Sequence, residues 1–334
     1  MARILLTQTI HPAAQARLAQ LGDVIVAPDT APDTLRKWAA GCAVVLVRAQ
    51  LPDDIFAAAP SLIGAVRHGA GVDMIPIAAA SAAGVLVANV PGVNANAVAE
   101  HVLRSMLQLA RRSAPMALRL GGRAAGWGRA RVLADEGFEL AGRTVGLVGY
   151  GHVGQAIARI CANGLAMRVL AHTRKPFAAA PAGRPSAPAP LATRVRLSEL
   201  LAQSDFVVLA CPLTDETRGL LGAQQLAQMR RGAYLINVAR GPVLNDAAVV
   251  EALRTGQLAG TALDVFDAIP LPDNHPFWQL ENVLITPHVA GITEDSMLAM
   301  GQGAAVAVEH LLRGAVPPNC INAQAVPAFL RRFA

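Results

Sequence analysis

A short run of glycines carries the clearest chemistry in this sequence. Residues 144–158 read T-V-G-L-V-G-Y-G-H-V-G-Q-A-I-A, so an apolar run is followed by Gly149, Gly151 and Gly154 in the spacing G-x-G-x-x-G. The first glycine permits a tight turn, the second lets backbone approach a pyrophosphate, and the third lets a helix pack closely on the strand. The pyrophosphate would bind the free N–H groups at the start of that helix. A glycine-rich turn without a ligand is the alternative, but the flanking strand and helix patterns favour a dinucleotide site.

A second glycine-bearing turn lies nearer the N-terminus. Residues 67–73 read R-H-G-A-G-V-D and follow an apolar run. Backbone N–H groups there could hold a carboxylate, because open α/β sheets bind ligands at the carboxyl ends of their strands. An ordinary tight turn explains the spacing equally well, so the spacing alone leaves both interpretations open.

The elements that must position these turns form two α/β regions. Short apolar runs alternate with helical patterns over residues 2–95, which predicts a parallel sheet. A turn-rich linker at 89–96 leads into a long helix predicted at 97–110, and residues 113–143 are expected to be irregular. A last helix, predicted at 296–312, is expected to pack on the first region. After the glycine motif, further strands are predicted at 167–171, 206–209, 234–238, 261–265 and 283–285.

Composition bounds the class of protein. The length of 334 residues is typical of about two domains, and the hydrophobic content of 53% is ample for their cores. No apolar run reaches the roughly 18 residues of a membrane helix, and the N-terminus does not read as a signal peptide. Four scattered cysteines show neither metal nor disulfide spacing, so we expect a cytoplasmic protein without a metal site. The net charge of +6 is dispersed, which argues against nucleic acid and fits attraction of small organic anions.

Several motifs in one order identify a resemblance. In chain order they are the turn at 68–73; N-V-P-G-V-N at 89–94 with V-A-E at 98–100; the glycine motif; C-P-L-T at 211–214 with E-T-R-G at 216–219; N-V-A-R-G at 237–241; L-D-V-F at 263–266; and T-P-H-V-A-G at 286–291. With these motifs, nearly the whole chain resembles the NAD(P)-dependent D-isomer-specific 2-hydroxyacid dehydrogenases. Such enzymes transfer a hydride between a nicotinamide cofactor and a small 2-keto or D-2-hydroxy acid.

The resemblance implies a fold and an assembly. It implies an α/β protein of two Rossmann-like domains with parallel sheets. A dinucleotide-binding domain, residues 98–295, would be inserted into a flavodoxin-like substrate domain made of residues 1–97 and 296–334. Members of the family are usually homodimers that pair through the cofactor domain.

The resemblance also assigns roles to residues. Arg240 would bind the substrate carboxylate and polarise its carbonyl, and His288 would be the general acid in reduction. Asp264 would hold the nicotinamide end, and the N–H groups of Ala70 and Gly71 would bind the substrate carboxylate. Without the surrounding motif, His288 would read as an ordinary loop histidine. The remaining implied cofactor-binding residues are Gly149, Gly151, His152, Val153, Gly154, Thr173, Arg174, Lys175, Cys211, Pro212, Thr217, Val238, Ala239 and Gly291.

The first departure from the family pattern concerns a catalytic carboxylate. Ile269 holds the position where the family usually has a Glu directly before a Pro. That carboxylate would normally raise the pKa of the catalytic histidine. Without it we expect His288 to titrate at or below about 6.5, so reduction should weaken as pH rises. Asp267, two residues earlier, would face the same way in an extended chain and is a candidate substitute.

The second departure concerns the cofactor. The acidic residue that usually binds the adenosine ribose, about 20 to 25 positions past the first glycine, is absent. Thr173 takes its place, and Arg174 and Lys175 follow. A carboxylate would repel a 2′-phosphate, whereas Arg174 would pair with it. The sequence therefore predicts NADP(H). The alternative is NAD(H), which applies if Arg174 and Lys175 are only the solvated end of a strand.

Three functional hypotheses follow. The leading one is a reductase of small 2-keto acids of the glyoxylate or hydroxypyruvate type. A dehydrogenase of larger or phosphorylated hydroxy acids, such as phosphoglycerate, is the nearby alternative, although we expect no appended C-terminal regulatory domain. The third is a catalytically weak dinucleotide-sensing or scaffold protein. The absence of the usual Glu at position 269 favours it, and the presence of both Arg240 and His288 opposes it.

Overall fold

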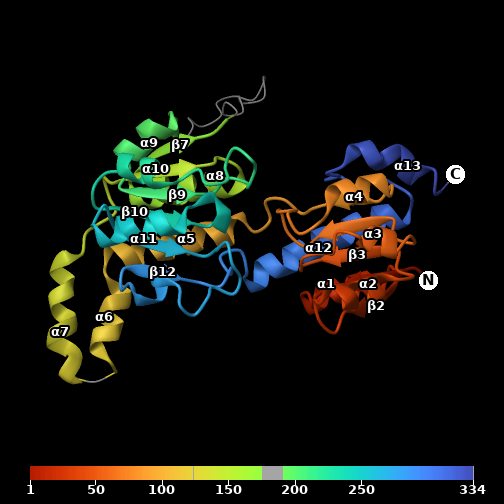
Figure 1. Ribbon diagram of the computed structural model, residues 1–334, viewed down its shortest axis with the longest axis horizontal. Helices are drawn as coiled ribbons and strands as arrows, with labels where there is room; N and C mark the ends of the chain where they lie inside the picture. The colour runs from red at the N-terminus through yellow and green to blue at the C-terminus, as the bar shows by residue number, and fades with distance from the viewer. Residues whose placement is uncertain (123, 175–190, 334) are drawn as a thin grey trace. The chain divides into compact units, whose positions relative to one another are not determined.

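The chain folds into two compact units. The computed structural model describes residues 1–122, 124–174 and 191–333. One unit comprises Met1–Asn94 and Ile292–Ala334, and the other comprises Ala95–Gly291 (Figure 1). The second unit is thus inserted into the first. The boundaries lie three residues before the predicted 97 and four before the predicted 295, because they fall at the start of one helix and just before another.

The first unit is built on a five-stranded sheet in which every pairing is parallel, with strand order β2-β1-β3-β4-β5. This is the order of flavodoxin-like folds. The strands are β1 (Arg3–Leu6), β2 (Asp23–Val26), β3 (Val44–Val47), β4 (Gly64–Arg67) and β5 (Leu86–Ala88). The helices are α1 (Pro12–Ala19), α2 (Pro32–Ala39), α3 (Ile55–Ala58), α4 (Ile77–Ala82), α12 (Glu294–Leu312) and α13 (Val326–Leu330).

Both faces of this sheet are buried, which explains the continuous apolar runs. Val44 and Leu46 of β3 pack in one cluster with residues of α1, α12 and α13, while Val45 and Val47 pack in another with α2 and α3. Helix α12 returns from the second unit to this sheet, as predicted, and Leu311 packs directly on β4 at Gly64.

The second unit is built on a seven-stranded sheet with the order β12-β11-β10-β9-β6-β7-β8. All its strand pairs are parallel as well. The order reverses between β6 and β9, which makes that junction the switch point where a doubly wound sheet binds a dinucleotide. The strands are β6 (Thr144–Val148), β7 (Arg168–His172), β8 (Thr193–Arg194), β9 (Phe206–Leu209), β10 (Ala233–Asn237), β11 (Leu258–Leu263) and β12 (Val283–Ile285).

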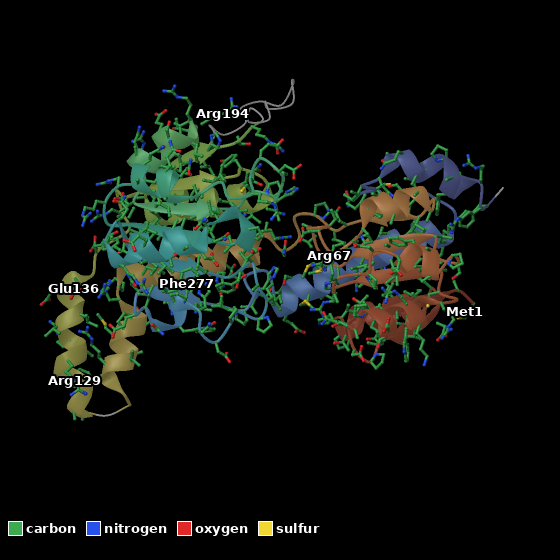
Figure 2. All side chains as sticks on the ribbon, viewed as in Figure 1. Met1, Arg67, Arg129, Glu136, Arg194 and Phe277 are labelled. Carbon is green, nitrogen blue, oxygen red and sulfur yellow. The ribbon has the colours of Figure 1, made fainter. Side chains whose placement is uncertain are left out.

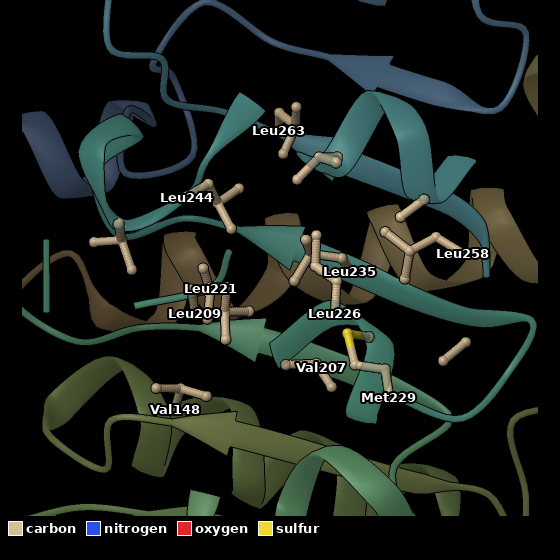
Figure 3. Packing of buried hydrophobic residues seen from close by; sticks show 14 of the residues in the cluster. Val148, Val207, Leu209, Leu221, Leu226, Met229, Leu235, Leu244, Leu258 and Leu263 are labelled. Carbon is tan, nitrogen blue, oxygen red and sulfur yellow. The ribbon is translucent and has the colours of Figure 1, made fainter. Parts of the chain in front are cut away.

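Helices cover both faces of the second sheet. Helices α5 and α8 pack on one face with Phe206 and Ile236, and α9, α10 and α11 pack on the other with Val207 and Leu235, as Figure 3 shows in part. The predicted α/β class with two parallel sheets is therefore confirmed. The helices are α5 (Ala95–Ala110), α6 (Ser113–Leu120), α7 (Trp127–Arg131), α8 (His152–Arg159), α9 (Leu197–Gln203), α10 (Ala223–Gln228) and α11 (Asp246–Arg254).

The expectation of irregular structure over residues 113–143 was wrong. Helices α6 and α7, with a 3₁₀ turn at Val132–Glu136, fill much of this segment and project from the sheet and its covering helices (Figure 1). Arg112 adopts a left-handed conformation (φ 53°) between α5 and α6, so the chain changes direction there. The abundant Ala and Arg are good helix formers, but glycines at 121, 122, 126 and 128 interrupt the segment and made it read as irregular.

No helix in the described part of the chain is long and apolar enough to cross a membrane.

Candidate active site

The predicted catalytic and cofactor residues of the second unit follow the carboxyl ends of its strands. The glycine turn follows β6, Thr173 follows β7, Cys211 follows β9, Arg240 follows β10 and Asp264 follows β11. Adjacent strands lie about 4.8 Å apart, so β7 and β11, four steps apart, are separated by about 19 Å. One edge of the sheet therefore brings together the glycine turn at Gly149 and the loop at Val289, which lie 140 residues apart in the sequence.

Each glycine of the motif has a separate structural role. Gly149 has φ +103°, and a Cβ built on it would lie 2.6 Å from the carbonyl oxygen of Ala210 at the end of β9. A Cβ on Gly154 would lie 2.4 Å from the carbonyl oxygen of Gly149, so α8 packs directly on the turn. Gly151, the N-cap of α8, meets no described atom within 4 Å of its added Cβ. A pyrophosphate fits this arrangement, because backbone can approach it at Gly151 beside the first N–H groups of α8.

Asp264 organises the loop that carries His288. Its side chain is buried, and both carboxylate oxygens accept hydrogen bonds: Oδ1 from the Thr286 hydroxyl (2.6 Å) and the Val289 N–H (2.9 Å), and Oδ2 from the Ala290 N–H (2.9 Å). The N–H of His288 donates to the Asp264 carbonyl oxygen at 2.8 Å. These bonds hold His288, which is exposed, in a left-handed conformation with φ 57°. The assigned contact of Asp264 with the nicotinamide stays a prediction.

A histidine on α5 extends this network. The Nε2 atom of His101 lies 3.3 Å from the Thr286 hydroxyl. Because that hydroxyl donates to Asp264, His101 Nε2–H is the donor to Thr286. Burial lowers the pKa of His101, which favours its neutral form. The sequence alone assigns no role to His101 or to Thr286, the first residue of the T-P-H-V-A-G motif, because only the folded chain brings these two residues together across 185 positions.

Arg240 lies on a tightly packed loop after β10. The fully buried Asn237 side chain spans the loop: its amide donates to the Arg240 carbonyl oxygen (3.0 Å) and its oxygen accepts from the Ala239 N–H (3.0 Å). A Cβ on Gly241 would lie 2.0 Å from the carbonyl carbon of Phe266, so only glycine permits this approach. The Arg240 guanidinium also donates to the Ala239 carbonyl oxygen (2.7 Å). The loops after β10 and β11 are thereby locked together.

The region after β7, predicted to bind the adenosine ribose, is rich in charge. Thr173 is half-buried, and Arg174 is exposed and pairs with Glu216 at 3.4 Å. Arg194 of β8, which sequence reasoning missed, donates to the carbonyl oxygens of Thr173 and Arg174, at 3.1 Å each. The predicted residue Lys175 lies outside the described residues.

The other predicted cofactor residues are distributed along the same edge. The Thr217 hydroxyl donates to the Pro212 carbonyl oxygen (2.7 Å) and accepts from the Thr214 N–H (2.7 Å), which folds the loop after β9. Cys211, at the start of that loop, is half-buried, and burial raises the pKa of its thiol. Each remaining residue adjoins a loop described above; these are His152, Val153, Val238, Ala239 and Gly291.

The position of the missing carboxylate is open to solvent. Ile269 is 72% exposed in the loop after β11. Burial raises the pKa of the Asp246 carboxyl and the Asp267 carboxylate raises it further, whereas His275 lowers it. Asp267 thus acts on Asp246 at the start of α11. A compensating contact between Asp267 and His288 stays a prediction.

In the first unit, Arg67 shapes the predicted anion-binding turn. Its guanidinium donates to the carbonyl oxygens of Gly71 (2.9 Å) and His68 (2.8 Å), and Asn89 donates to that of Ala70 (2.7 Å) (Figure 2 marks Arg67). The carbonyls are therefore turned inward, and no hydrogen bond within the described chain engages the N–H of Ala70 or Gly71. The role of Ala70 and Gly71 in binding a substrate carboxylate stays a prediction.

Neither metal nor disulfide chemistry is built into the described residues. They contain no group of three or more His, Cys, Asp or Glu side chains arranged to hold a metal ion, and all four cysteines are free. Burial raises the pKa of Cys161 to about 12, so this thiol is an inert part of the core.

Comparison with known proteins gives one family. The family model described as "D-isomer specific 2-hydroxyacid dehydrogenase, NAD binding domain" matches residues 103–290. A glyoxylate reductase of Aeropyrum pernix is 34% identical over 336 residues, which cover 97% of each chain. A D-3-phosphoglycerate dehydrogenase of Methanocaldococcus jannaschii is 32% identical over 98% of this chain and 60% of its own length.

A solved structure extends the comparison. The NADPH-dependent glyoxylate/hydroxypyruvate reductase of Sinorhizobium meliloti, crystallised with NADP and malonate, is 26% identical to this chain. It superposes with a TM-score of 0.81 over 97% of each chain.

Proposed function

Because the chain belongs to the D-isomer-specific 2-hydroxyacid dehydrogenase family, we propose that it reduces a small 2-keto acid, of the glyoxylate or hydroxypyruvate type, with NADPH. A dehydrogenase of this family binds a nicotinamide dinucleotide and acts on small 2-keto or 2-hydroxy acids. The observation that carries the proposal is that Arg240 follows β10 and His288 follows β12, the two strands on either side of β11, in the sheet whose switch point bears the glycine turn.

The residues would divide the chemistry as follows. The Arg240 guanidinium binds the carboxylate of the keto acid and draws electron density from its carbonyl group, because a fixed planar cation suits both tasks. The His288 imidazolium donates its proton to the carbonyl oxygen and becomes neutral. When bound, the reduced nicotinamide supplies the hydride to the carbonyl carbon. Asp264 holds the His288 loop in place while the proton moves.

Cofactor choice rests on the residues after β7. A ribose-binding carboxylate is replaced by Thr173, and two arginines, Arg174 and Arg194, lie beside it. This combination supports NADPH, since a 2′-phosphate gains charge-assisted hydrogen bonds from guanidinium groups. We expect kcat/KM for NADPH to exceed that for NADH by tenfold or more at saturating keto acid. Equal values for the two cofactors would contradict the preference.

The substrate is tested with a panel of glyoxylate, hydroxypyruvate and 3-phosphohydroxypyruvate, measured as cofactor oxidation. The first two are expected to give the higher kcat/KM. Relatives that are D-3-phosphoglycerate dehydrogenases make the phosphorylated acid the second candidate. If 3-phosphohydroxypyruvate exceeds both smaller acids, the phosphoglycerate function replaces the one proposed.

We also propose that the protein is a homodimer that pairs through the projecting helices of the second unit. Leu118 of α6 and Trp127 of α7 are each 69% exposed, and Val132 just beyond α7 is 59% exposed. Large apolar side chains gathered on one exposed projection mark interaction surfaces. The family resemblance makes a second copy of this chain the expected partner.

A further inference from the structure

Arg194 is fixed at the edge of the seven-stranded sheet by backbone carbonyls. It belongs to β8, the edge strand, where it pairs with Ala171 of β7. Figure 2 labels Arg194. Its Nη2 donates to the carbonyl oxygens of Thr173 and Arg174, both at 3.1 Å, and its Nε lies 3.4 Å from the former. These bonds hold the guanidinium against the end of β7, although its side chain is exposed.

The two arginines at this end of the sheet differ in their partners. Arg174 lies 3.4 Å from the Glu216 carboxylate, which also accepts a hydrogen bond from the Thr214 hydroxyl (2.6 Å). That hydrogen bond and Arg174 lower the pKa of Glu216, so the carboxylate is ionised at neutral pH. Arg194 pairs with no carboxylate among the described residues, and its Nη1 makes no hydrogen bond to them. Of these two arginines, Arg194 is therefore the one whose positive charge is not neutralised by a described carboxylate.

We infer that Arg194, rather than Arg174, is the main determinant of 2′-phosphate recognition, and that Glu216 weakens that recognition by competing for Arg174. This inference rests on the proposed preference for NADPH. In a doubly wound sheet the strand after the glycine helix ends beside the adenosine ribose, which is where Arg194 is anchored. A guanidinium held by two carbonyls retains N–H groups for a phosphate and loses little freedom on binding.

The test compares two nucleotides that differ by this phosphate. The dissociation constants of 2′,5′-ADP and 5′-AMP are measured by calorimetry for the wild type, Arg194→Gln and Arg174→Gln. Arg194→Gln is expected to weaken 2′,5′-ADP at least tenfold and 5′-AMP less than twofold, and Arg174→Gln is expected to have the smaller effect. Glu216→Gln is expected to tighten 2′,5′-ADP about twofold to fivefold.

A matched control removes the same charge elsewhere. Arg168 is an exposed arginine at the opposite end of β7, so Arg168→Gln should leave both nucleotides unchanged. Arg194→Lys keeps the charge without the planar fork and should recover part of the lost 2′,5′-ADP affinity. Thermal unfolding of every variant verifies that it is folded.

Several outcomes would overturn the inference. One is a larger loss in Arg174→Gln than in Arg194→Gln, and another is an unchanged nucleotide ratio in Arg194→Gln. Equal weakening of both nucleotides would also overturn it, because Arg194 would then act only by holding the end of β7. A wild type that prefers NADPH while Arg194→Gln behaves normally leaves the proposed function intact. A wild type that binds both nucleotides equally contradicts the NADPH preference itself.

Discussion

A single buried carboxylate, Asp264, shows how this protein holds His288, the exposed group that we propose as the proton donor. The His288 side chain is exposed and stands on a left-handed backbone, a conformation that is uncommon for non-glycine residues. Three hydrogen bonds to the Asp264 carboxylate, from Thr286, Val289 and Ala290, specify the path of the loop. His101 adds a fourth contact through Thr286. The protein therefore uses buried polar groups to position a side chain that packing alone does not hold.

A buried histidine in the first unit should make folding depend on pH. Burial lowers the pKa of His68 to about 4, and the positive charges of Arg48 and Arg67 act in the same direction. The unfolded chain, with an ordinary value near 6.5, binds the proton more readily, so stability is complete above about pH 6.5 and falls as the pH drops toward 4. When the pH is lowered from 7.5 to 5, the protonation of His68 in the unfolded chain should lower the free energy of unfolding by about 2 kcal/mol.

Urea unfolding of wild type and His68→Leu at those two pH values measures the effect. On acidification, the free energy of unfolding of the variant should fall by about 2 kcal/mol less than that of the wild type. His152→Leu removes an exposed histidine and should behave like the wild type. Identical pH dependence in wild type and His68→Leu would show that other groups govern the acid response.

Individual residues differ in how far the sequence predicts their roles. Arg240, His288 and the three glycines stand inside motifs, and the structure places them at strand ends where ligands bind. Arg194 could not be found this way, because only the pairing of β7 with β8 brings it to Thr173, 21 residues away in the chain. Thr286 and His101 depend likewise on a contact across 185 residues.

At the scale of elements, two glycines in the turn between β6 and α8 have different tasks: we expect Gly154 to matter for stability and Gly151 for cofactor binding. A methyl group on Gly154 would meet the Gly149 carbonyl oxygen at 2.4 Å, whereas one on Gly151 meets no described atom. Gly154→Ala should therefore lower the unfolding free energy by about 1–3 kcal/mol through overpacking. Gly151→Ala should cost less than about 1 kcal/mol, since it changes only the N-cap residue.

Gly151→Ala, which should change stability little, should have a large effect on cofactor binding. Its added methyl would occupy the place where backbone approaches the pyrophosphate, so Gly151→Ala should weaken NADPH at least tenfold. Urea unfolding and calorimetric titration with NADPH, applied to both variants, give the two quantities. Normal NADPH affinity in a folded Gly151→Ala protein would argue that the dinucleotide does not bind at this turn.

Elements with strong patterns were predicted well, and the others were not. The alternation of apolar strands and amphipathic helices predicted both parallel sheets, because buried strands and helices leave different periods in the sequence. The last helix, predicted at 296–312, runs from Glu294 to Leu312 behind a Thr293 cap. Helices α6 and α7 were missed because they project from the sheet and bury few of their side chains, among them Pro115 and Ala130. These helices are also short and are separated by glycines, which are typical of turns.

At the scale of the whole molecule, the projecting helices provide a test of assembly. If α6 and α7 form the dimer interface, the double variant Leu118→Glu/Trp127→Glu should be monomeric in sedimentation velocity at micromolar concentration, because buried unpaired charges oppose association. The wild type should sediment as a dimer. Ile321→Glu changes an exposed apolar residue of the first unit and should remain dimeric. A dimeric double variant would place the interface elsewhere.

The central claim is that this protein is an enzyme in which His288 supplies the proton, and one kinetic comparison tests it. NADPH oxidation by glyoxylate and hydroxypyruvate is followed from about pH 5 to 9, the range that brackets imidazole titration, for wild type and His288→Gln. The wild type should turn over at least one acid, at a rate that falls as pH rises. The variant should lose about 10²- to 10⁴-fold in kcat while its dissociation constant for NADPH stays within threefold of the wild-type value. Stoichiometric NADPH binding by the wild type with no turnover of any keto acid, or full activity in His288→Gln, would contradict the claim.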